Sequence, residues 1–228
     1  MRVGCFDRAL LIGNTRWHWA ERDGALWRME HCPPQLSRLA GGPVVWAAVG
    51  VVPAALDTAP HHRMALADVG LEKAPAWLGI DRALAAVAAW QSTQAMGLDG
   101  TRGVLVADAG TVLSLTLLDG SAQFIGGQLV PGLQLQLEAM DRGTAGLPGI
   151  QRMTAAQSER FPTQTAAAMR RGALSALAGA VRQAWEDSGA LLWISGGDGP
   201  DLARELELRG VHHRHDPDLV LKGLVSRI

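Results

Sequence analysis

The chain has 228 residues, of which 48% are apolar and 19% are charged, an ordinary composition for one large domain or two small ones. Its formal net charge of -1 provides no polybasic field of the kind that holds nucleic acid or anionic lipid. The apolar runs are shorter than the roughly 20 residues of a membrane-spanning helix, and the N-terminal residues lack the pattern of a signal peptide. We therefore expect a cytoplasmic protein that binds neither nucleic acid nor a membrane.

The first 30 residues predict three strands joined by two turns. An apolar strand over 9–12 ends in the turn Gly13-Asn14-Thr15, an alternating strand begins at Trp17, and the hairpin turn Asp23-Gly24 leads to a strand over 25–29. The small turn would present backbone N–H groups and a Thr hydroxyl, which suit a phosphate. The alternative is that its glycine serves only to make a tight turn.

A strand is expected over 44–49, and a helix is expected from the Ala-rich segment LGIDRALAAVAAW. Asp81 and Arg82 lie at the start of that helix, where the helix dipole and the free N–H groups favour anions. Asp81 would accept a proton from a substrate hydroxyl, and Arg82 would bind an anionic group of the substrate. The alternative is that Asp81 is only a favourable residue of a first helical turn.

The pattern of the first 30 residues occurs a second time. A strand over 104–107 ends in Asp108-Ala109-Gly110-Thr111, and a strand over 112–118, the turn Asp119-Gly120 and a strand over 122–125 follow. This duplication predicts an α/β fold of two similar halves that face each other across a cleft, where the two turns bind a polyphosphate from both sides. Asp108 would bind a cation beside the second turn, because hard cations prefer oxygen ligands; the alternative is a capping or turn role.

The remaining elements are helices over 131–140 and 165–187 and a strand over 191–195. Gly196 and Gly197 follow that strand and precede a further helix. Glycines in such a place let a flat ligand approach the backbone closely.

Six motifs in this order resemble those of type III pantothenate kinases. They are GNT at 13–15, GxDR at 79–82, DxGT at 108–111, GGxxxPGxxL at 126–135, TAxLP at 144–148 and SGGD at 195–198. The resemblance runs from about residue 10 to residue 224. It implies two ribonuclease-H-like halves of the actin/Hsp70/sugar-kinase type, over 1–78 and 79–228 with a boundary at roughly 75–102, and a homodimer. It also implies that ATP phosphorylates pantothenate to 4'-phosphopantothenate, the first step of coenzyme A biosynthesis.

The same resemblance implies roles for individual residues. Asp81 would be the general base on the pantothenate hydroxyl, Gly79, Ile80 and Arg82 would line its pocket, and Thr165 would contact pantothenate. Asp108 would hold the activating monovalent cation, potassium or ammonium, and Mg²⁺ would accompany ATP. The ATP site would consist of Leu11, Ile12, Gly13, Asn14, Thr15, Arg16, Trp17, His18, Gly110, Thr111, Gly196 and Gly197.

Two positions depart from the family pattern. Leu11 stands where the family has an Asp, and Asp7 lies about 13 Å upstream at about 3.3 Å per strand residue, too far to replace it. Magnesium often keeps several waters and relies on the substrate's phosphates, so we expect a weaker affinity for magnesium or ATP. Glu72 stands where the family has a substrate-contacting Tyr.

Two alternatives follow. The loss of the acid at position 11 is compatible with a non-catalytic or regulatory relative that binds the nucleotide or pantothenate. A different small-molecule kinase on the same scaffold is also compatible, because a fold does not determine its substrate.

Overall fold

The computed structural model describes residues 6–57, 60–149 and 159–228. The chain forms two compact units. Unit 1 consists of Met1–Gly103, Leu118–Ile125 and Asp218–Ile228, and unit 2 of Val104–Leu117 and Gly126–Pro217. The boundary between repeated halves near residue 78 stays a prediction, because these units reflect packing and not repetition.

The first sheet contains the three strands expected near the N-terminus and two more. They are β1 (Arg8–Ile12), β2 (Trp17–Asp23), β3 (Leu26–Cys32), β4 (Val45–Ala48) and β5 (His62–Arg63). Their order is β3-β2-β1-β4-β5, with β1 antiparallel to β2 and parallel to β4. The Asp23-Gly24 hairpin sets the register of β2 and β3, and Gly24 has the positive φ of +61° that such a turn requires.

The alternating pattern of β1 and β2 separates the two faces of this sheet. One face holds a core of Leu10, Ile12, Trp17, Trp19, Cys32, Leu39, Val44, Trp46 and Leu56, covered by the short 3-10 helices η1 (Leu36–Gly41) and η2 (Ala54–Leu56). The other face holds Leu11, His18 and His31, which are partners in register across three strands.

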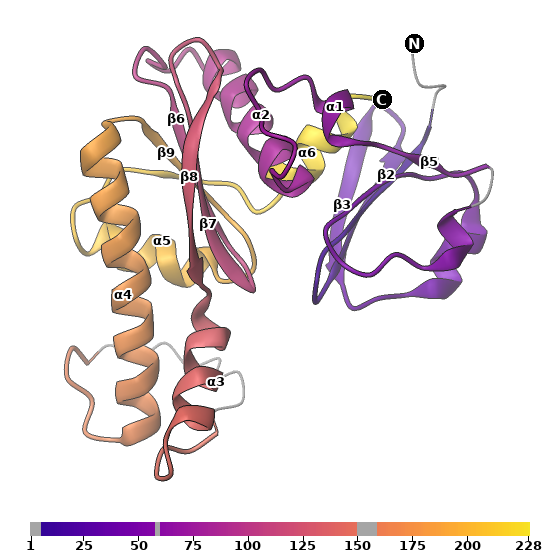
Figure 1. Cartoon of the computed structure of the whole chain (residues 1–228). Coiled ribbons are helices and arrows are strands. Elements are labelled where there is room, and N and C mark those ends of the chain that lie inside the picture. The colour runs from indigo at the N-terminus through magenta and orange to yellow at the C-terminus, as the bar shows by residue number, and fades with distance from the viewer. Residues whose placement is uncertain (1–5, 58–59, 150–158) are drawn as a thin grey trace. The chain divides into compact units, whose positions relative to one another are not determined.

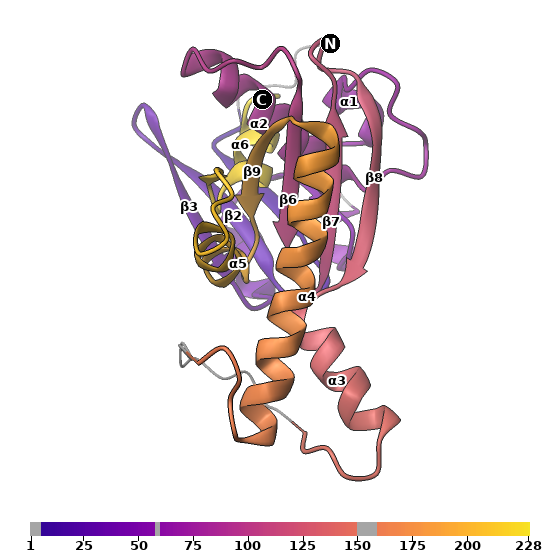
Figure 2. The same ribbon diagram turned by 90° about the vertical axis from the view of Figure 1, so that its left-hand side faces the viewer.

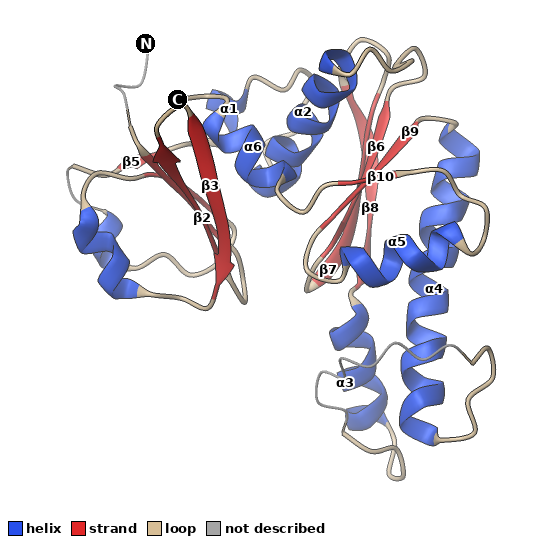
Figure 3. Cartoon of the chain, turned by 180° about the vertical axis from the view of Figure 1, so that it is seen from behind, coloured by secondary structure: helices blue, strands red, loops and turns tan. Residues whose placement is uncertain are grey.

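The described residues of unit 1 form three α-helices. They are α1 (Leu66–Val69), α2 (Ile80–Ala95) and α6 (Leu219–Val225). The helix α2 lies against α6, as Figure 1 and Figure 3 show, and a Cβ on Gly223 would lie 2.2 Å from the carbonyl oxygen of Leu84. Glycine at 223 therefore permits close packing of the two helices. The helix α6 also contacts β1 and β2.

The second sheet has the same strand order as the first. It contains β6 (Val104–Ala109), β7 (Val112–Leu118), β8 (Phe124–Pro131), β9 (Leu191–Ser195) and β10 (Arg214–His215) in the order β8-β7-β6-β9-β10. The strand β6 is parallel to β9 as β1 is to β4, and β9 is parallel to β10 as β4 is to β5. The duplication predicted from the sequence is confirmed.

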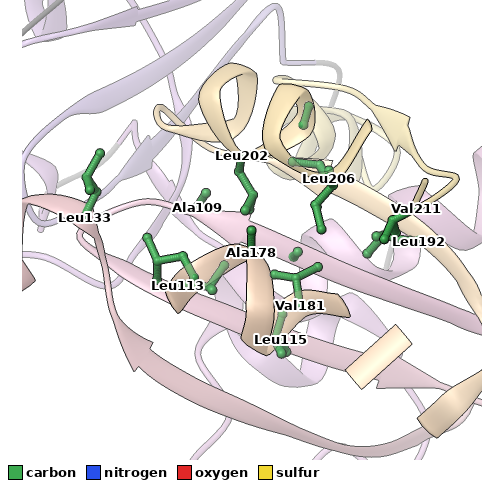
Figure 4. Close-up of a cluster of buried hydrophobic side chains, with 14 of the residues drawn as sticks. Ala109, Leu113, Leu115, Leu133, Ala178, Val181, Leu192, Leu202, Leu206 and Val211 are labelled. Atoms are coloured by element: carbon green, nitrogen blue, oxygen red, sulfur yellow. The ribbon is translucent and has the colours of Figure 1, made fainter. Parts of the chain in front are cut away.

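Unit 2 builds its core between its strands and the helices α3 (Leu133–Gly143), α4 (Thr165–Ser188) and α5 (Gly199–Glu207). Figure 2 shows α4 lying across β6 and β7, with α3 beside its N-terminal half. The close-up in Figure 4 shows side chains of α4, α5 and the strands meeting in one apolar cluster, with Leu113, Ala178, Val181, Leu192 and Leu202 among them. The helix α4 ends at Gly189, whose φ of +60° is the usual left-handed end of a helix.

The helix expected from Pro131 begins later, so this expectation is wrong at its start. Pro131 is the last residue of β8, and α3 begins at Leu133 with Gly132 as its N-cap. The N–H of Gly132 donates to the carbonyl oxygen of Thr111 at 3.0 Å, which holds the chain in an extended conformation at this point. Among the described helices, none is both long and apolar enough to span a membrane.

Candidate active site

The first turn, Gly13-Asn14-Thr15, is closed by its own backbone. The N–H of Gly13 donates to the carbonyl oxygen of Arg16 at 2.9 Å, so this N–H is occupied by the turn itself. The N–H groups of Val49 and Gly50 donate to the carbonyl oxygen of Ile12 at 2.9 and 3.1 Å. A Cβ on Gly50 would lie 2.2 Å from the carbonyl oxygen of Gly13, so only glycine fits there. Asn14 and Thr15 form the exposed part of the turn.

The second turn, in unit 2, is also closed by a backbone hydrogen bond, which spans two residues where that of the first turn spans three. The N–H of Gly110 donates to the carbonyl oxygen of Val112 at 3.4 Å. A Cβ on Gly132 would lie 2.2 Å from the carbonyl oxygen of Gly110. Each turn therefore has a second glycine, distant in sequence, packed against its first carbonyl group.

The residues at the strand ends before the two turns differ in chemistry. Leu11 is 3% exposed and is the register partner of His18 on β2 and of Ala47 on β4. Asp108 is half-buried and is the register partner of Ser195 on β9. The first sheet therefore has an apolar side chain at the strand position where the second sheet has a carboxylate.

The carboxylate of Asp108 lies against Gly196, where any larger residue would collide with it. A Cβ on Gly196 would lie 2.5 Å from Oδ1 of Asp108, and the φ of Gly196 is +89°. The structure thus brings Asp108, Gly110, Thr111 and Gly196 to one end of the second sheet, and Gly197 is the next residue along the chain.

The oxygen atoms at this end of the second sheet suit a cation. Oγ of Ser195 is buried and has no hydrogen-bond partner among the described residues, and its strand position is paired with that of Asp108. Within the described ranges, no group of three or more His, Cys, Asp or Glu residues is arranged to hold a metal. A cation at Asp108 would therefore complete its ligands with neutral oxygens, water and the phosphates of a substrate.

Asp81 is the second residue of α2, two positions after the N-cap residue Gly79. Its Oδ1 accepts the N–H of Arg82 at 2.8 Å, and a Cβ on Gly79 would lie 2.5 Å from the same oxygen. Burial raises the pKa of Asp81, and this effect outweighs the hydrogen bonds and the charge of Arg82, which act in the opposite direction. The carboxylate is thus more basic than an exposed Asp, as a proton acceptor requires.

Ile80 and Arg82 flank Asp81 and are buried, each 8% exposed. Burial lowers the pKa of Arg82, and the neighbouring Asp81 charge opposes that change. The guanidinium remains charged at physiological pH. The first turn of α2 therefore places a carboxylate and a guanidinium side by side, as the sequence predicts.

Glu72 is held by the turn between β7 and β8. Its carboxylate accepts a hydrogen bond from Nε2 of Gln123 at 3.0 Å, and its carbonyl oxygen accepts the N–H of Phe124 at 3.0 Å. The position that departs from the family pattern thus contributes to packing within unit 1.

Thr165 is the first residue of α4 and is exposed. The next turn of α4 borders a cavity of about 410 Å³ between α3 and α4. The cavity is lined by Pro131, Gln136, Ala139, Met140, Ala168, Met169, Gly172 and Ala173. Thr165 therefore lies one helical turn from an apolar cavity.

His31 and Asp218 of unit 1 were not predicted as site residues. They form a hydrogen-bonded series with His18, which was. Nδ1 of His18 lies 2.6 Å from Nδ1 of His31, and Nε2 of His31 lies 2.9 Å from Oδ1 of Asp218. The Asp23-Gly24 hairpin is a signal in the sequence that pairs His18 with His31. No local signal indicates Asp218, which is 187 residues further along the chain than His31.

The sequence of the chain matches known kinases over most of its length. The sequence model of the type III pantothenate kinase family matches residues 52–187. A type III pantothenate kinase of Synechococcus elongatus is 34% identical over 241 residues, covering 94% of this chain and 93% of the relative. A second one, of Thermosynechococcus vestitus, is 36% identical over 214 residues, covering 87% of this chain and 80% of the relative.

The chain belongs to the type III pantothenate kinase family. Members of this family are kinases that phosphorylate pantothenate on the way to coenzyme A, so the chain is assigned to the phosphotransferases.

Solved structures confirm the fold class. A Campylobacter jejuni protein described as a Baf family transcriptional activator has a TM-score of 0.66 at 18% identity, covering 97% of this chain and 96% of that chain. A protein of Sinorhizobium meliloti described as a 2-dehydro-3-deoxygalactonokinase has a TM-score of 0.59 at 15% identity, covering 97% of this chain and 98% of that chain. These similarities, together with the two five-stranded sheets, place the fold in the actin/Hsp70/sugar-kinase class.

Proposed function

We propose that this chain transfers the γ-phosphoryl group of ATP to the hydroxyl of pantothenate, and that Asp81 is the general base. The proposal rests on family membership and on one feature of the structure. Asp81 is a carboxylate of raised pKa at a helix N-terminus, and the absence of a side chain at Gly79 makes room for its Oδ1.

The reaction needs little covalent help from the protein. As the hydroxyl oxygen bonds to the γ-phosphorus, the bond to the bridging oxygen breaks, ADP leaves, and the hydroxyl proton passes to Asp81. The main tasks of the protein are to hold the two substrates in line and to neutralise the phosphate charge. Arg82 and Thr165 hold pantothenate, together with the backbone of Gly79 and Ile80.

The nucleotide-binding residues of unit 1 are 11–18, around the first glycine turn. Those of unit 2 are Gly110, Thr111, Gly196 and Gly197, around the second, and each turn binds phosphate oxygens of ATP. A solved structure with a TM-score of 0.52, the activator of 2-hydroxyisocaproyl-CoA dehydratase from Clostridium difficile, contains bound ADPNP. This neighbour supports a nucleotide as the ligand of the fold.

Asp108 holds the monovalent cation, potassium or ammonium, with the buried hydroxyl of Ser195 close by in the register of the sheet. Mg²⁺ accompanies ATP and neutralises charge on its phosphates. Because Leu11 has no ligand atom, we expect the magnesium affinity to be weaker than a carboxylate at this position would give.

The active form is a homodimer in the cytoplasm. The apolar cavity between α3 and α4 and the exposed side chain of Leu129 support a second copy of the chain as a partner of unit 2. The need for ATP supports the cytoplasmic location.

A coupled ADP-release assay with pantothenate, ATP and Mg²⁺, with and without potassium, tests the proposal. We expect pantothenate-dependent turnover that potassium stimulates, and its loss in Asp81→Ala. Asp187→Ala, which removes an exposed carboxylate of α4, is the matched control and should retain full activity. Full activity in Asp81→Ala would contradict the base assignment.

The same assay separates the alternatives. Binding of pantothenate without turnover at saturating ATP, Mg²⁺ and potassium would indicate the non-catalytic relative suggested by Leu11. Turnover with another hydroxyl substrate, and none with pantothenate, would indicate a different kinase on this scaffold.

A further inference from the structure

His18, His31 and Asp218 form a hydrogen-bonded series within unit 1. The distances are 2.6 Å between the two Nδ1 atoms and 2.9 Å from Nε2 of His31 to Oδ1 of Asp218. Both His side chains lie on the same face of the sheet as Leu11, because residues 11, 18 and 31 are partners in register. Asp218 directly precedes α6 and so attaches the series to that helix.

The hydrogen bonds couple the position of the proton on His18 to the protonation state of His31. A carboxylate only accepts, so Nε2 of His31 donates to Asp218. If His31 is neutral, its Nδ1 accepts from His18, and Nε2 of His18 is then an acceptor. If His31 is protonated at both nitrogens, its Nδ1 donates to His18, and Nε2 of His18 then bears a proton and is a donor.

His18 itself stays neutral in both states. Burial, and then the charges of His31 and Arg16, lower its pKa from 6.5 to about 4. The proton on His31 therefore decides whether Nε2 of His18 offers a lone pair or an N–H.

The free edge of His18 faces the first turn. A Cβ on Gly13 would lie 3.3 Å from Nε2 of His18 and 2.9 Å from the carbonyl oxygen of Arg16. Glycine at 13 thus leaves the space in front of this nitrogen open. Nε2 makes no hydrogen bond to the described residues, and its cross-strand neighbour Leu11 has no polar atom to compete for it.

We propose that Nε2 of His18 donates a hydrogen bond to a phosphate oxygen of the nucleotide, and that His31 and Asp218 are positioning residues that hold His18 in the donating tautomer. The proposal rests on the proposed function, which makes the first turn a phosphate site. A phosphate oxygen only accepts, so it selects the state in which Nε2 of His18 donates. In that state Asp218 accepts from one side of His31 and Nδ1 of His18 accepts from the other. An N–H donor thus stands beside Leu11, the position where the family has an Asp.

Calorimetric binding of ADPNP with Mg²⁺ to the full chain tests the contact. Loss of a hydrogen bond to a charged group predicts a Kd about tenfold higher in His18→Leu and in His31→Leu. His18→Gln, whose amide can donate from a similar place, should restore most of the affinity. His212→Gln changes an exposed histidine of unit 2 and should bind as wild type does. Pantothenate binding should be unchanged in all four variants.

Imidazole ¹⁵N shifts give a readout that a purely structural role would not change. In the wild-type chain saturated with ADPNP and Mg²⁺, Nε2 of His18 should bear the proton and Nδ1 should not. In His31→Leu and Asp218→Asn this preference should be lost, even where the melting temperature is unaltered. Retention of the proton on Nδ1 of His18 in the saturated wild-type complex would overturn the proposal.

The outcomes distinguish this inference from the proposed function. If the wild-type chain does not bind ADPNP, both are overturned. If it binds ADPNP and phosphorylates pantothenate, and His18→Leu binds ADPNP equally well, the function stands and the role of His18 is wrong.

Discussion

The two glycine turns share one architecture and differ in chemistry. In each, a distant glycine packs against the first carbonyl of the turn, Gly50 at Gly13 and Gly132 at Gly110, with 2.2 Å from the position of a Cβ to the oxygen. In each sheet the turn follows the central strand of a five-stranded order. The residue two positions before the glycine of the turn, however, is buried Leu11 in one case and half-buried Asp108 in the other.

This difference shows that the backbone conformation of such a turn does not depend on whether a carboxylate stands beside it. The backbone depends on glycines that permit close approach, and both turns keep them. The charge depends on one side chain, and only the second turn has a carboxylate. The first unit instead has Asp81 on α2 and the His18–His31–Asp218 series, so its polar chemistry lies on other elements.

The largest effect is expected at Asp81, the acid of the first unit. Asp81→Asn should lower kcat by about 10²- to 10⁴-fold, the usual contribution of a general base. Burial raises the pKa of Asp81, so its contribution to stability is present below the unfolded pKa and is lost as the pH rises through the folded pKa. At neutral pH the asparagine variant should therefore melt at the same or a higher temperature. A lower melting temperature with retained kcat would contradict both statements.

The second largest effect is expected at Asp108, and the equivalent substitution at Leu11 allows a direct comparison of the two strand ends. Asp108→Asn should lower kcat/KM for ATP by about 10- to 100-fold and shift the potassium dependence to higher concentration, because a cation ligand is lost. Leu11→Asn, at the equivalent position of the first sheet, is the matched control and should leave the potassium dependence unchanged. Equal losses in both variants would show that the two turns do not differ as proposed.

The glycine contacts test the shared architecture. Gly50→Ala and Gly132→Ala each place a Cβ against a backbone oxygen, so each should lower the free energy of unfolding by about 1–3 kcal/mol or more. Gly179→Ala on α4 meets no atom within 4 Å and should be neutral or stabilising. Denaturant unfolding monitors all three. If Gly132→Ala lowered the free energy of unfolding and Gly50→Ala did not, the two turns would not share the same glycine contact.

The smallest effect is expected from restoring the missing acid. Leu11→Asp places a carboxylate opposite His18, where it should move the magnesium titration of the kinase reaction to lower concentration by a few-fold. The same carboxylate should raise the pKa of His18, which NMR titration can follow. An unchanged magnesium titration would mean that position 11 does not face the phosphates.

Much of the fold was predictable from local pattern. The strands over 112–118 and 191–195 have the predicted bounds, and the helix predicted over 165–187 ends one residue later, at Ser188. These segments have clear periodicity and end at glycine or turn residues. The start of α3 was predicted wrongly, because Pro131 is also compatible with the end of an edge strand, and the contact of Gly132 with Thr111 is not local.

The sequence by itself determined the repeated strand-turn-strand pattern, the α/β class and the positions of Asp81, Asp108 and the two turns, because periodicity and turn chemistry act over a few residues. Only the tertiary structure decided that Gly50 and Gly132 close the turns, that Asp108 lies against Gly196, and that His18 connects through His31 to Asp218. The physical reason is distance along the chain. These contacts join segments whose proximity is set by the packing of whole strands and helices, which no short stretch of sequence encodes.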